Sequence, residues 1–317
     1  MTNQKLFAHP EILSILYRKI LTIRILESRL QSYCDVGLAG DLHFNKGQEA
    51  ISVGVCAALK KTDRIVTHHR TIAHQIAAGA KLGPLVAELL GKSSGVNGGR
   101  AGEMHISDAS IHHAFSFQLV GTCIPVAAGL AWALAHHHLS KDIVAVFFGD
   151  AASGNGQFHE GMNLIGVHRL PVLLVCENNH LAGNIKSSFY MPGNLSVADR
   201  AKAYQIRSQT VDGNDLGVVV KAANEARSYI ETTGAPYLLE CYTERLSWHK
   251  QGQRDVRSKE ELSKLAESEP LVRLTKSLGS LIDVPTMRRE IELEIDRAFV
   301  ECVDSEPPAF TEERTDE

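Results

Sequence analysis

Two apolar runs separated by one helix-like segment constrain the fold of this chain more than any other feature. The first run, residues 143–148 (IVAVFF), ends in Gly149-Asp150, and the second, residues 172–176 (VLLVC), ends in Glu177-Asn178-Asn179. Uninterrupted apolar runs of this length are typical of strands that helices cover on both faces. Residues 157–167 between them read as a helix, so this region predicts a strand–helix–strand unit.

The same alternation of helices and strands extends over much of the chain. Residues 12–30 carry apolar side chains at steps of three or four and predict a long first helix. Residues 236–240 predict a later strand, and further helices are expected at 48–59, 125–135 and 216–231. Strands that alternate with helices indicate the α/β class, a parallel sheet with helices on both faces. We expect residues 1–317 to form a single domain that ends in a C-terminal helical tail.

Composition excludes several classes of protein. A net charge of −4 with no basic cluster argues against nucleic acid or an anionic membrane as a partner. No stretch reaches the roughly 20 apolar residues of a membrane span, and the first residues do not resemble a signal peptide. The six cysteines are scattered without a C-x-x-C pair, which predicts reduced thiols and a cytoplasmic location.

Polar residues follow both strands of the central unit, and they predict a cation site. Asp150 and Asn179 each stand just beyond a strand, and parallel strands bring such ends to one edge of a sheet. Magnesium binds carboxylate and amide oxygens and often adds phosphate oxygens. The loop at 151–156 (AASGNG) can offer N–H groups to phosphate, and the following helix adds its positive end. Each motif alone is ordinary turn chemistry, but together they favour a diphosphate bound through magnesium.

A second glycine-rich segment lies at residues 95–102 (GVNGGRAG). Because glycine lacks a side chain, we expect this loop to be able to approach a ligand closely.

The stretch GDAASGNGQFHEGMNLIGVHRLPVLLVCENN resembles the thiamine-diphosphate motif of the alpha subunit of two-chain 2-oxo acid dehydrogenases, which include the pyruvate, acetoin and branched-chain enzymes. Other segments fit the same family in order, among them LYRKILTIRILESRL, HFNKGQEAISVGV, LVGTCIPVAAGLAWA and EIDRAFVECVDSEPPAF. The resemblance covers residues from about 12 to 310 and implies a thiamine-diphosphate-binding fold.

The resemblance implies thiamine diphosphate and Mg²⁺ as cofactors and assigns residues to them. Asp150 and Asn179 would ligate magnesium through their side chains, and Leu181 through its backbone carbonyl. Ala151 and Ala152 would give backbone contacts to the diphosphate.

Further cofactor positions lie elsewhere in the chain. By the same resemblance, Arg70 would pair with phosphate oxygens through its bidentate guanidinium, and Val120 would lie beside the cofactor's rings. His69 and Gln118 stand at two more cofactor-binding positions, where the family usually has Tyr and Gly.

Two histidines match positions that the family uses near the reacting centre. His249 stands on the loop near the diphosphate, and His43 precedes the Gly-Gln-Glu-Ala segment. We expect both to be catalytic, the alternative for each being a structural histidine with satisfied hydrogen bonds. Glu49, in the same segment, is expected to be structural.

The family resemblance also implies a partner. In such enzymes the glutamate that activates the cofactor belongs to a beta subunit, so we expect this chain to be inactive alone and to work as an α2β2 assembly. The leading reading is an alpha subunit that decarboxylates a 2-oxo acid, or cleaves the acyloin acetoin, and passes the acyl group to a lipoyl acyltransferase. One alternative is a lipoyl-independent two-chain decarboxylase or carboligase, and another is a non-catalytic scaffold, which the intact Asp150 and Asn179 disfavour.

Departures from the family pattern fall mainly at substrate-facing and loop positions. They are Ala151 for Gly, His69 for Tyr, Ile72 for His, Gln118 for Gly, Lys250 for Ser and Glu103 for Ser. We therefore expect the reaction class to hold with a donor or acyl acceptor other than the standard one. The loop at 246–258 offers no obvious target for the phosphorylation that regulates some relatives.

Overall fold

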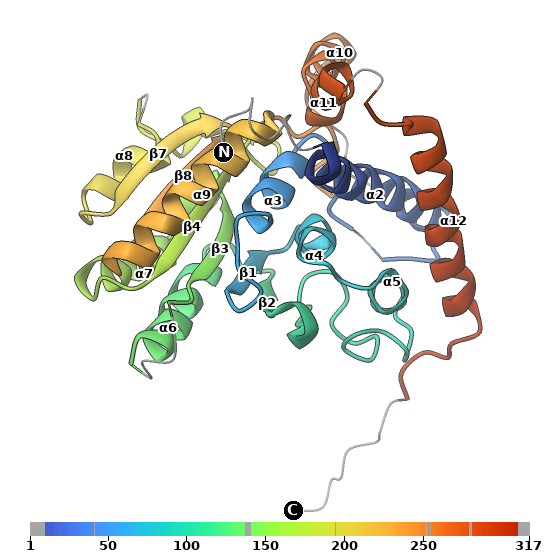
Figure 1. The fold of residues 1–317 in the computed structure, drawn as a ribbon, viewed down its shortest axis with the longest axis horizontal. Helices are drawn as coiled ribbons and strands as arrows, with labels where there is room; N and C mark the ends of the chain where they lie inside the picture. The colour runs from blue at the N-terminus through green and yellow to red at the C-terminus, as the bar shows by residue number, and fades with distance from the viewer. Residues whose placement is uncertain are drawn as a thin grey trace, which may run out of the picture.

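A six-stranded parallel sheet forms the centre of the computed structural model, which describes residues 10–40, 42–136, 141–193, 195–250, 253, 255–278 and 281–309 (Figure 1). The strand order is β2-β1-β3-β4-β8-β7, and each neighbouring pair is parallel. The strands are β1 (Arg64–His68), β2 (His113–Phe117), β3 (Val144–Gly149), β4 (Val172–Asn178), β7 (Arg207–Asp212) and β8 (Tyr237–Tyr242). The predicted α/β class is confirmed.

Helices cover both faces of the sheet. One face packs against α6 (Cys123–His136), α7 (Gly156–Val167) and α8 (Val197–Lys202), and the other against α3 (Glu49–Cys56) and α9 (Leu216–Thr233). Strand β3 divides its side chains between the two: Val146 and Phe148 join the first cluster, and Ala145 and Phe147 join the second. Both faces of this strand are therefore dry, which explains its uninterrupted apolar sequence.

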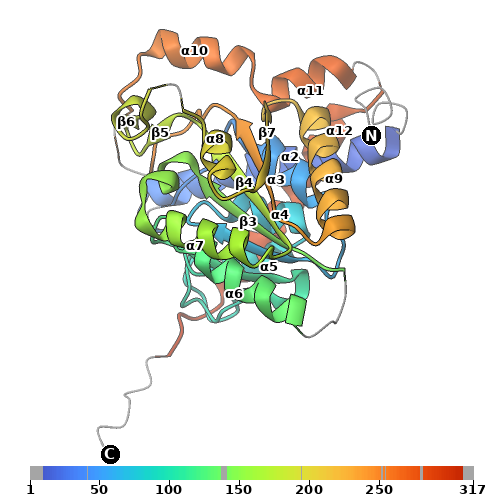
Figure 2. The same cartoon turned by 90° about the vertical axis from the view of Figure 1, so that its left-hand side faces the viewer.

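A separate helical layer lies beside the sheet (Figure 1). It consists of α2 (Pro10–Asp35), α4 (Ile72–Ala78), α5 (Leu82–Leu89), α11 (Pro270–Leu278) and α12 (Val284–Val303). Arg18 on α2 donates to Glu290 (2.9 Å) and Glu294 (2.6 Å) on α12, so the first and last long helices lie side by side. Helix α10 (Lys259–Glu267) and α11 lie at one end of the molecule (Figure 2).

Most elements read from the sequence are present with small shifts of their ends. The strands expected at 143–148, 172–176 and 236–240 are β3, β4 and β8, and the helices expected at 12–30, 48–59, 125–135, 157–167 and 216–231 are α2, α3, α6, α7 and α9. Three strands of the six-stranded sheet, β1, β2 and β7, were not predicted, and neither was the short hairpin of β5 (Leu181–Ala182) and β6 (Ile185–Lys186). Strands β2 and β7 lie at the sheet edges, and both carry exposed positions that break the apolar run. All six cysteines are free thiols. None of the described helices is both long and apolar enough to cross a membrane.

The glycine-rich loop at 95–102 wraps around a carboxylate of the chain itself. Glu88, fully buried on α5, accepts backbone N–H groups from Asn97 (2.7 Å) and Gly99 (2.9 Å) through Oε2. Its Oε1 accepts those of Ala101 (2.7 Å) and Gly102 (3.1 Å). The loop's close approach is therefore made to Glu88, and these four amide groups are occupied by it.

We predict that Glu88→Ala destabilises the protein by roughly 2–4 kcal/mol, because it leaves four buried or half-buried N–H groups without their charged acceptor. Glu88→Gln should also destabilise it, since an amide NH₂ would face two of those donors. Urea unfolding of the purified chain measures both effects, with the exposed Glu267→Gln as control. A wild-type unfolding midpoint for Glu88→Gln would contradict this account of the loop.

Candidate active site

The ends of two neighbouring strands bring the predicted cation ligands together. Strands β3 and β4 pair over six residues, with Gly149 opposite Glu177, so Asp150 and Asn179 follow adjacent strand ends. Asp150 opens the short 3-10 turn Asp150–Gly154, and Asn179 precedes the two-residue strand β5 (Leu181–Ala182). Both residues line one cavity of about 250 Å³. The expectation that these two strands are close in the sheet is confirmed.

Most of the other predicted site residues line the same cavity. They are His69, Arg70, Val120, Ala151, Ala152, Leu181 and His249. Gln118, exposed just after β2, is not among the lining residues, and neither is His43, which contacts the lining residues His69 and His249. Four further residues line the cavity although no sequence motif marked them as site residues: Gln48, His68, Glu177 and Arg245.

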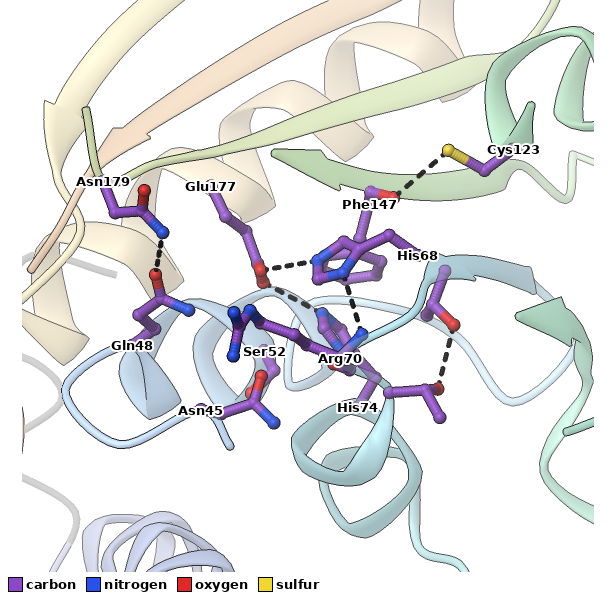
Figure 3. A network of polar contacts seen from close by, with 12 residues as sticks. Asn45, Gln48, Ser52, His68, Arg70, His74, Cys123, Phe147, Glu177 and Asn179 are labelled. Atoms are coloured by element: carbon purple, nitrogen blue, oxygen red, sulfur yellow. Dashed lines mark hydrogen bonds and ion pairs between the residues drawn. The ribbon is translucent and has the colours of Figure 1, made fainter. Parts of the chain in front are cut away.

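Asp150 and Asn179 are held by specific hydrogen bonds. The hydroxyl of Tyr190 donates to Asp150 Oδ2 (2.5 Å), and burial raises the pKa of Asp150 to about 6. The amide nitrogen of Asn179 donates to Gln48 Oε1 (2.6 Å; Figure 3), while its Oδ1 accepts the N–H of Leu181 (3.0 Å). These two bonds fix which end of the amide is oxygen, and that oxygen has a second lone pair to offer.

Two buried guanidinium groups give the cavity a positive wall. Arg70 is 4% exposed and donates to Phe44 O (2.8 Å) and His249 Nδ1 (3.1 Å), and Arg245 is 2% exposed and donates to Gly183 O (2.6 Å). Within the described residues, neither guanidinium forms an ion pair with a carboxylate. Burial lowers the pKa of Arg70 to about 10 and that of Arg245 to about 9, so both stay protonated at neutral pH. A buried charge without a counterion is costly, and an anionic ligand would remove that cost.

Three histidine rings cluster at this cavity. The ring centroid of His43 lies 4.7 Å from that of His69 and 5.4 Å from that of His249. Burial, followed by the charge of Arg70, lowers the pKa of His43 to about 3 and that of His249 to about 4. Burial also lowers the pKa of His69 well below its usual range. The three imidazoles are therefore neutral at neutral pH, and each can accept or donate a hydrogen bond.

Glu103 anchors one of these histidines. Its carboxylate accepts the backbone N–H of His43 (2.9 Å) and contacts the ring nitrogen Nδ1 (3.0 Å). This residue stands where the family pattern usually has Ser, so a departure from that pattern contacts a histidine of the site directly. Glu49 is fully buried and accepts from Arg24 Nε (2.7 Å) and Gly47 N (3.0 Å), in agreement with the structural role expected for it.

Comparison with known proteins gives one consistent family. Residues 17–309 match the family described as the dehydrogenase E1 component. The alpha subunit of an acetoin:2,6-dichlorophenolindophenol oxidoreductase from Bacillus subtilis is 40% identical over 75% of this chain and 71% of its own length. Its namesake from Cupriavidus necator is 37% identical over 76% of this chain and 72% of its own length. A pyruvate dehydrogenase E1 component subunit alpha from Rhizobium meliloti is 32% identical, over 80% of this chain and 74% of its own length. The chain belongs to the dehydrogenase E1 component family.

Proposed function

We propose that this chain is the alpha subunit of a two-chain thiamine-diphosphate enzyme that decarboxylates a 2-oxo acid or cleaves acetoin and transfers the acyl group to a lipoyl acceptor. Membership in the E1 family implies thiamine diphosphate as the cofactor. One observation supports this site: the cavity at the strand ends combines the side chains of Asp150 and Asn179 with two buried guanidinium groups that form no ion pair with any described carboxylate. A positive wall and a set of oxygen ligands together suit a diphosphate bound with its magnesium ion.

The donor set fits magnesium. The side chains of Asp150 and Asn179 and the carbonyl of Leu181 would hold Mg²⁺, and all three residues line the cavity. They offer oxygen only, which is what this hard cation prefers. Arg70 would bind phosphate oxygens, and the small residues Ala151 and Ala152 let the diphosphate approach the backbone.

The chain's own groups have defined tasks around the reacting centre. When bound, thiamine diphosphate supplies an electron sink for the decarboxylation. His249 accepts a hydrogen bond at Nδ1 from Arg70, so its neutral ring carries the proton at Nε2 and can donate it to a substrate oxygen. His43, held at Nδ1 by Glu103, supplies a second ring close by. Val120 and His69, which line the cavity, would contact the cofactor. Gln118 stays a proposed cofactor contact on the family resemblance alone, since it is exposed just after β2.

A beta subunit would complete the site. We propose that this partner carries the glutamate that activates the cofactor, and that the two chains assemble as α2β2. The present chain would form one domain with a helical C-terminal tail. Support comes from apolar side chains around the end of the edge strand β2: Phe115, Leu119 and Val120 are 51%, 70% and 44% exposed. Exposed apolar clusters of this kind are typical of protein interfaces.

A second candidate is a two-chain decarboxylase or carboligase that does not use a lipoyl partner. The observation that favours it is the replacement of family residues beside the three histidines. Glu103, which replaces the family's Ser, is hydrogen-bonded to His43, and His69, which replaces the family's Tyr, is one of the three histidines.

We predict that Asp150→Ala and Asn179→Ala each weaken magnesium-dependent binding of thiamine diphosphate by more than about 100-fold, because outer partners of metal ligands alone are worth about 10–100-fold. Calorimetry on the chain co-expressed with its beta subunit measures the affinity, and the exposed Asp304→Ala is the matched control. Unchanged affinity in both variants would refute the assignment of the site.

We also predict that turnover requires the beta subunit and that pyruvate with a lipoyl acceptor is not the best substrate pair. Rates with pyruvate, acetoin and branched-chain 2-oxo acids, each with a lipoyl domain or an artificial electron acceptor, separate the two candidates. Full pyruvate dehydrogenase activity with a lipoyl acceptor would contradict the expectation of a non-standard donor or acceptor. Turnover of a 2-oxo acid by the alpha chain alone would show that the two-chain proposal is wrong.

A further inference from the structure

A buried carboxylate joins two histidines at the wall of the proposed cofactor site (Figure 3). Glu177, at the carboxyl end of β4, contacts His68 Nε2 through Oε2 (2.8 Å) and His74 Nε2 through Oε1 (2.9 Å). His68 ends β1 and His74 lies on α4, so the cluster connects three elements. All three residues are buried. Burial alone would raise the pKa of Glu177, but the neighbouring His74 and His68 lower it.

The backbone of Arg70 determines the proton positions on both rings. Its N–H can only donate, so His68 Nδ1 (3.1 Å) is the acceptor, and the proton on this neutral ring lies at Nε2, facing Glu177. The carbonyl of Arg70 can only accept, so His74 Nδ1 (3.1 Å) carries a proton and donates it. Both polar groups of the Arg70 backbone are thus bound by histidines whose other ring nitrogens contact Glu177.

The position of this backbone determines where the Arg70 guanidinium lies. Arg70 stands in the short connection between β1 and α4, and its side chain lines the cavity. The same guanidinium donates to Phe44 O and His249 Nδ1. A shift of the connection would therefore move the charge that faces the cavity as well as the bond to His249.

A metal centre at this cluster fits the hydrogen bonds less well. The ligand atoms of Glu177, His68 and His74 lie within 4.8 Å of one another, as they would around an ion. However, His68 Nδ1 already accepts an N–H, so a cation at Nε2 would require a ring that had lost both protons. Without an ion, the observed bonds fit an ionised Glu177 that accepts from His68 Nε2–H and from His74 Nε2–H, with the His74 ring protonated at both nitrogens.

We propose that Glu177 is a positioning residue for the cofactor's diphosphate, acting through His68 and His74, which clamp the backbone of Arg70. This inference rests on the proposed function, since it takes the ligand of Arg70 to be the diphosphate. Glu177 contributes by orienting the two rings, and it need not touch the reacting atoms.

The clamp gives a specific expectation for conservative substitution. In Glu177→Gln the amide oxygen can accept from His68 Nε2–H, and the amide NH₂ can donate to His74 Nε2 once that ring has released its Nε2 proton. Glu177→Gln should therefore keep the affinity for thiamine diphosphate within about threefold of wild type, whereas Glu177→Met, which can hold neither ring, should weaken it about 10–100-fold. At saturating cofactor, kcat of Glu177→Met should recover, because the reacting groups are unchanged.

A double-mutant cycle with Arg70→Gln tests whether the effect passes through Arg70. In the assembled two-chain enzyme, Kd for thiamine diphosphate is measured by calorimetry with Mg²⁺, and kcat is measured at saturating cofactor. We expect Glu177→Met to weaken binding in the Arg70 background and to add no further loss in the Arg70→Gln background. Glu225→Met, at an exposed position on α9, is the matched control.

Two results would overturn the proposal: wild-type affinity in Glu177→Met, or an equal loss in both backgrounds. If Glu177→Met does not fold, His68→Leu is tested in its place. This variant removes one of the two histidines that hold the Arg70 backbone, and His68 lies on the cavity wall. It should weaken binding only when Arg70 is present, and an equal loss without Arg70 would again refute the clamp. Failure of the wild-type assembly to bind thiamine diphosphate would instead refute the proposed function.

Discussion

The pairing of β3 with β4 is the constraint on which the candidate site depends. Their parallel register brings Asp150 and Asn179 to neighbouring strand ends, and dry faces above and below keep the two strands fixed. The residues that complete the cavity come from other connections at the same ends: Arg70 follows β1, Val120 follows β2 and Arg245 follows β8. The sheet thus gathers charges of both signs at one edge. No carboxylate in the described part of the chain forms an ion pair with Arg70 or Arg245, which leaves both guanidinium groups available to an anionic ligand.

The parts of the fold and of the site that could be predicted are those whose residues lie close together in the sequence. Strands β3 and β4 were predictable because each is a continuous apolar run, and their polar ends follow directly in the chain. Strand β7 was missed because its sequence, RSQTVD, is largely polar at the sheet edge. Glu88 shows the converse limit: the glycine-rich loop was recognised, but the carboxylate that fills it lies on the preceding helix.

The polar networks of the site were not predictable from sequence spacing. Glu177 meets its histidine partners across 109 and 103 residues, and Glu103 meets His43 across 60. No periodicity links such pairs, since they meet only after the sheet has formed. Family resemblance identified nine of the residues that line the cavity, because it assigns roles to positions in the sequence. It could not indicate that Glu103, a departure from the pattern, would be fixed to one of the site's histidines.

The packing of α12 against α2 has a consequence for the order of events during synthesis. Helix α2 is synthesised long before α11 and α12, but Tyr17 bonds to Thr275 (3.0 Å) across 258 residues and Arg18 bonds to Glu290 across 272. Ile291, Ile295 and Phe299 of α12 belong to the same apolar cluster as α2. The nascent chain therefore cannot close its helical layer until α12 has been synthesised, and until then part of the apolar face of α2 remains uncovered for chaperones to bind.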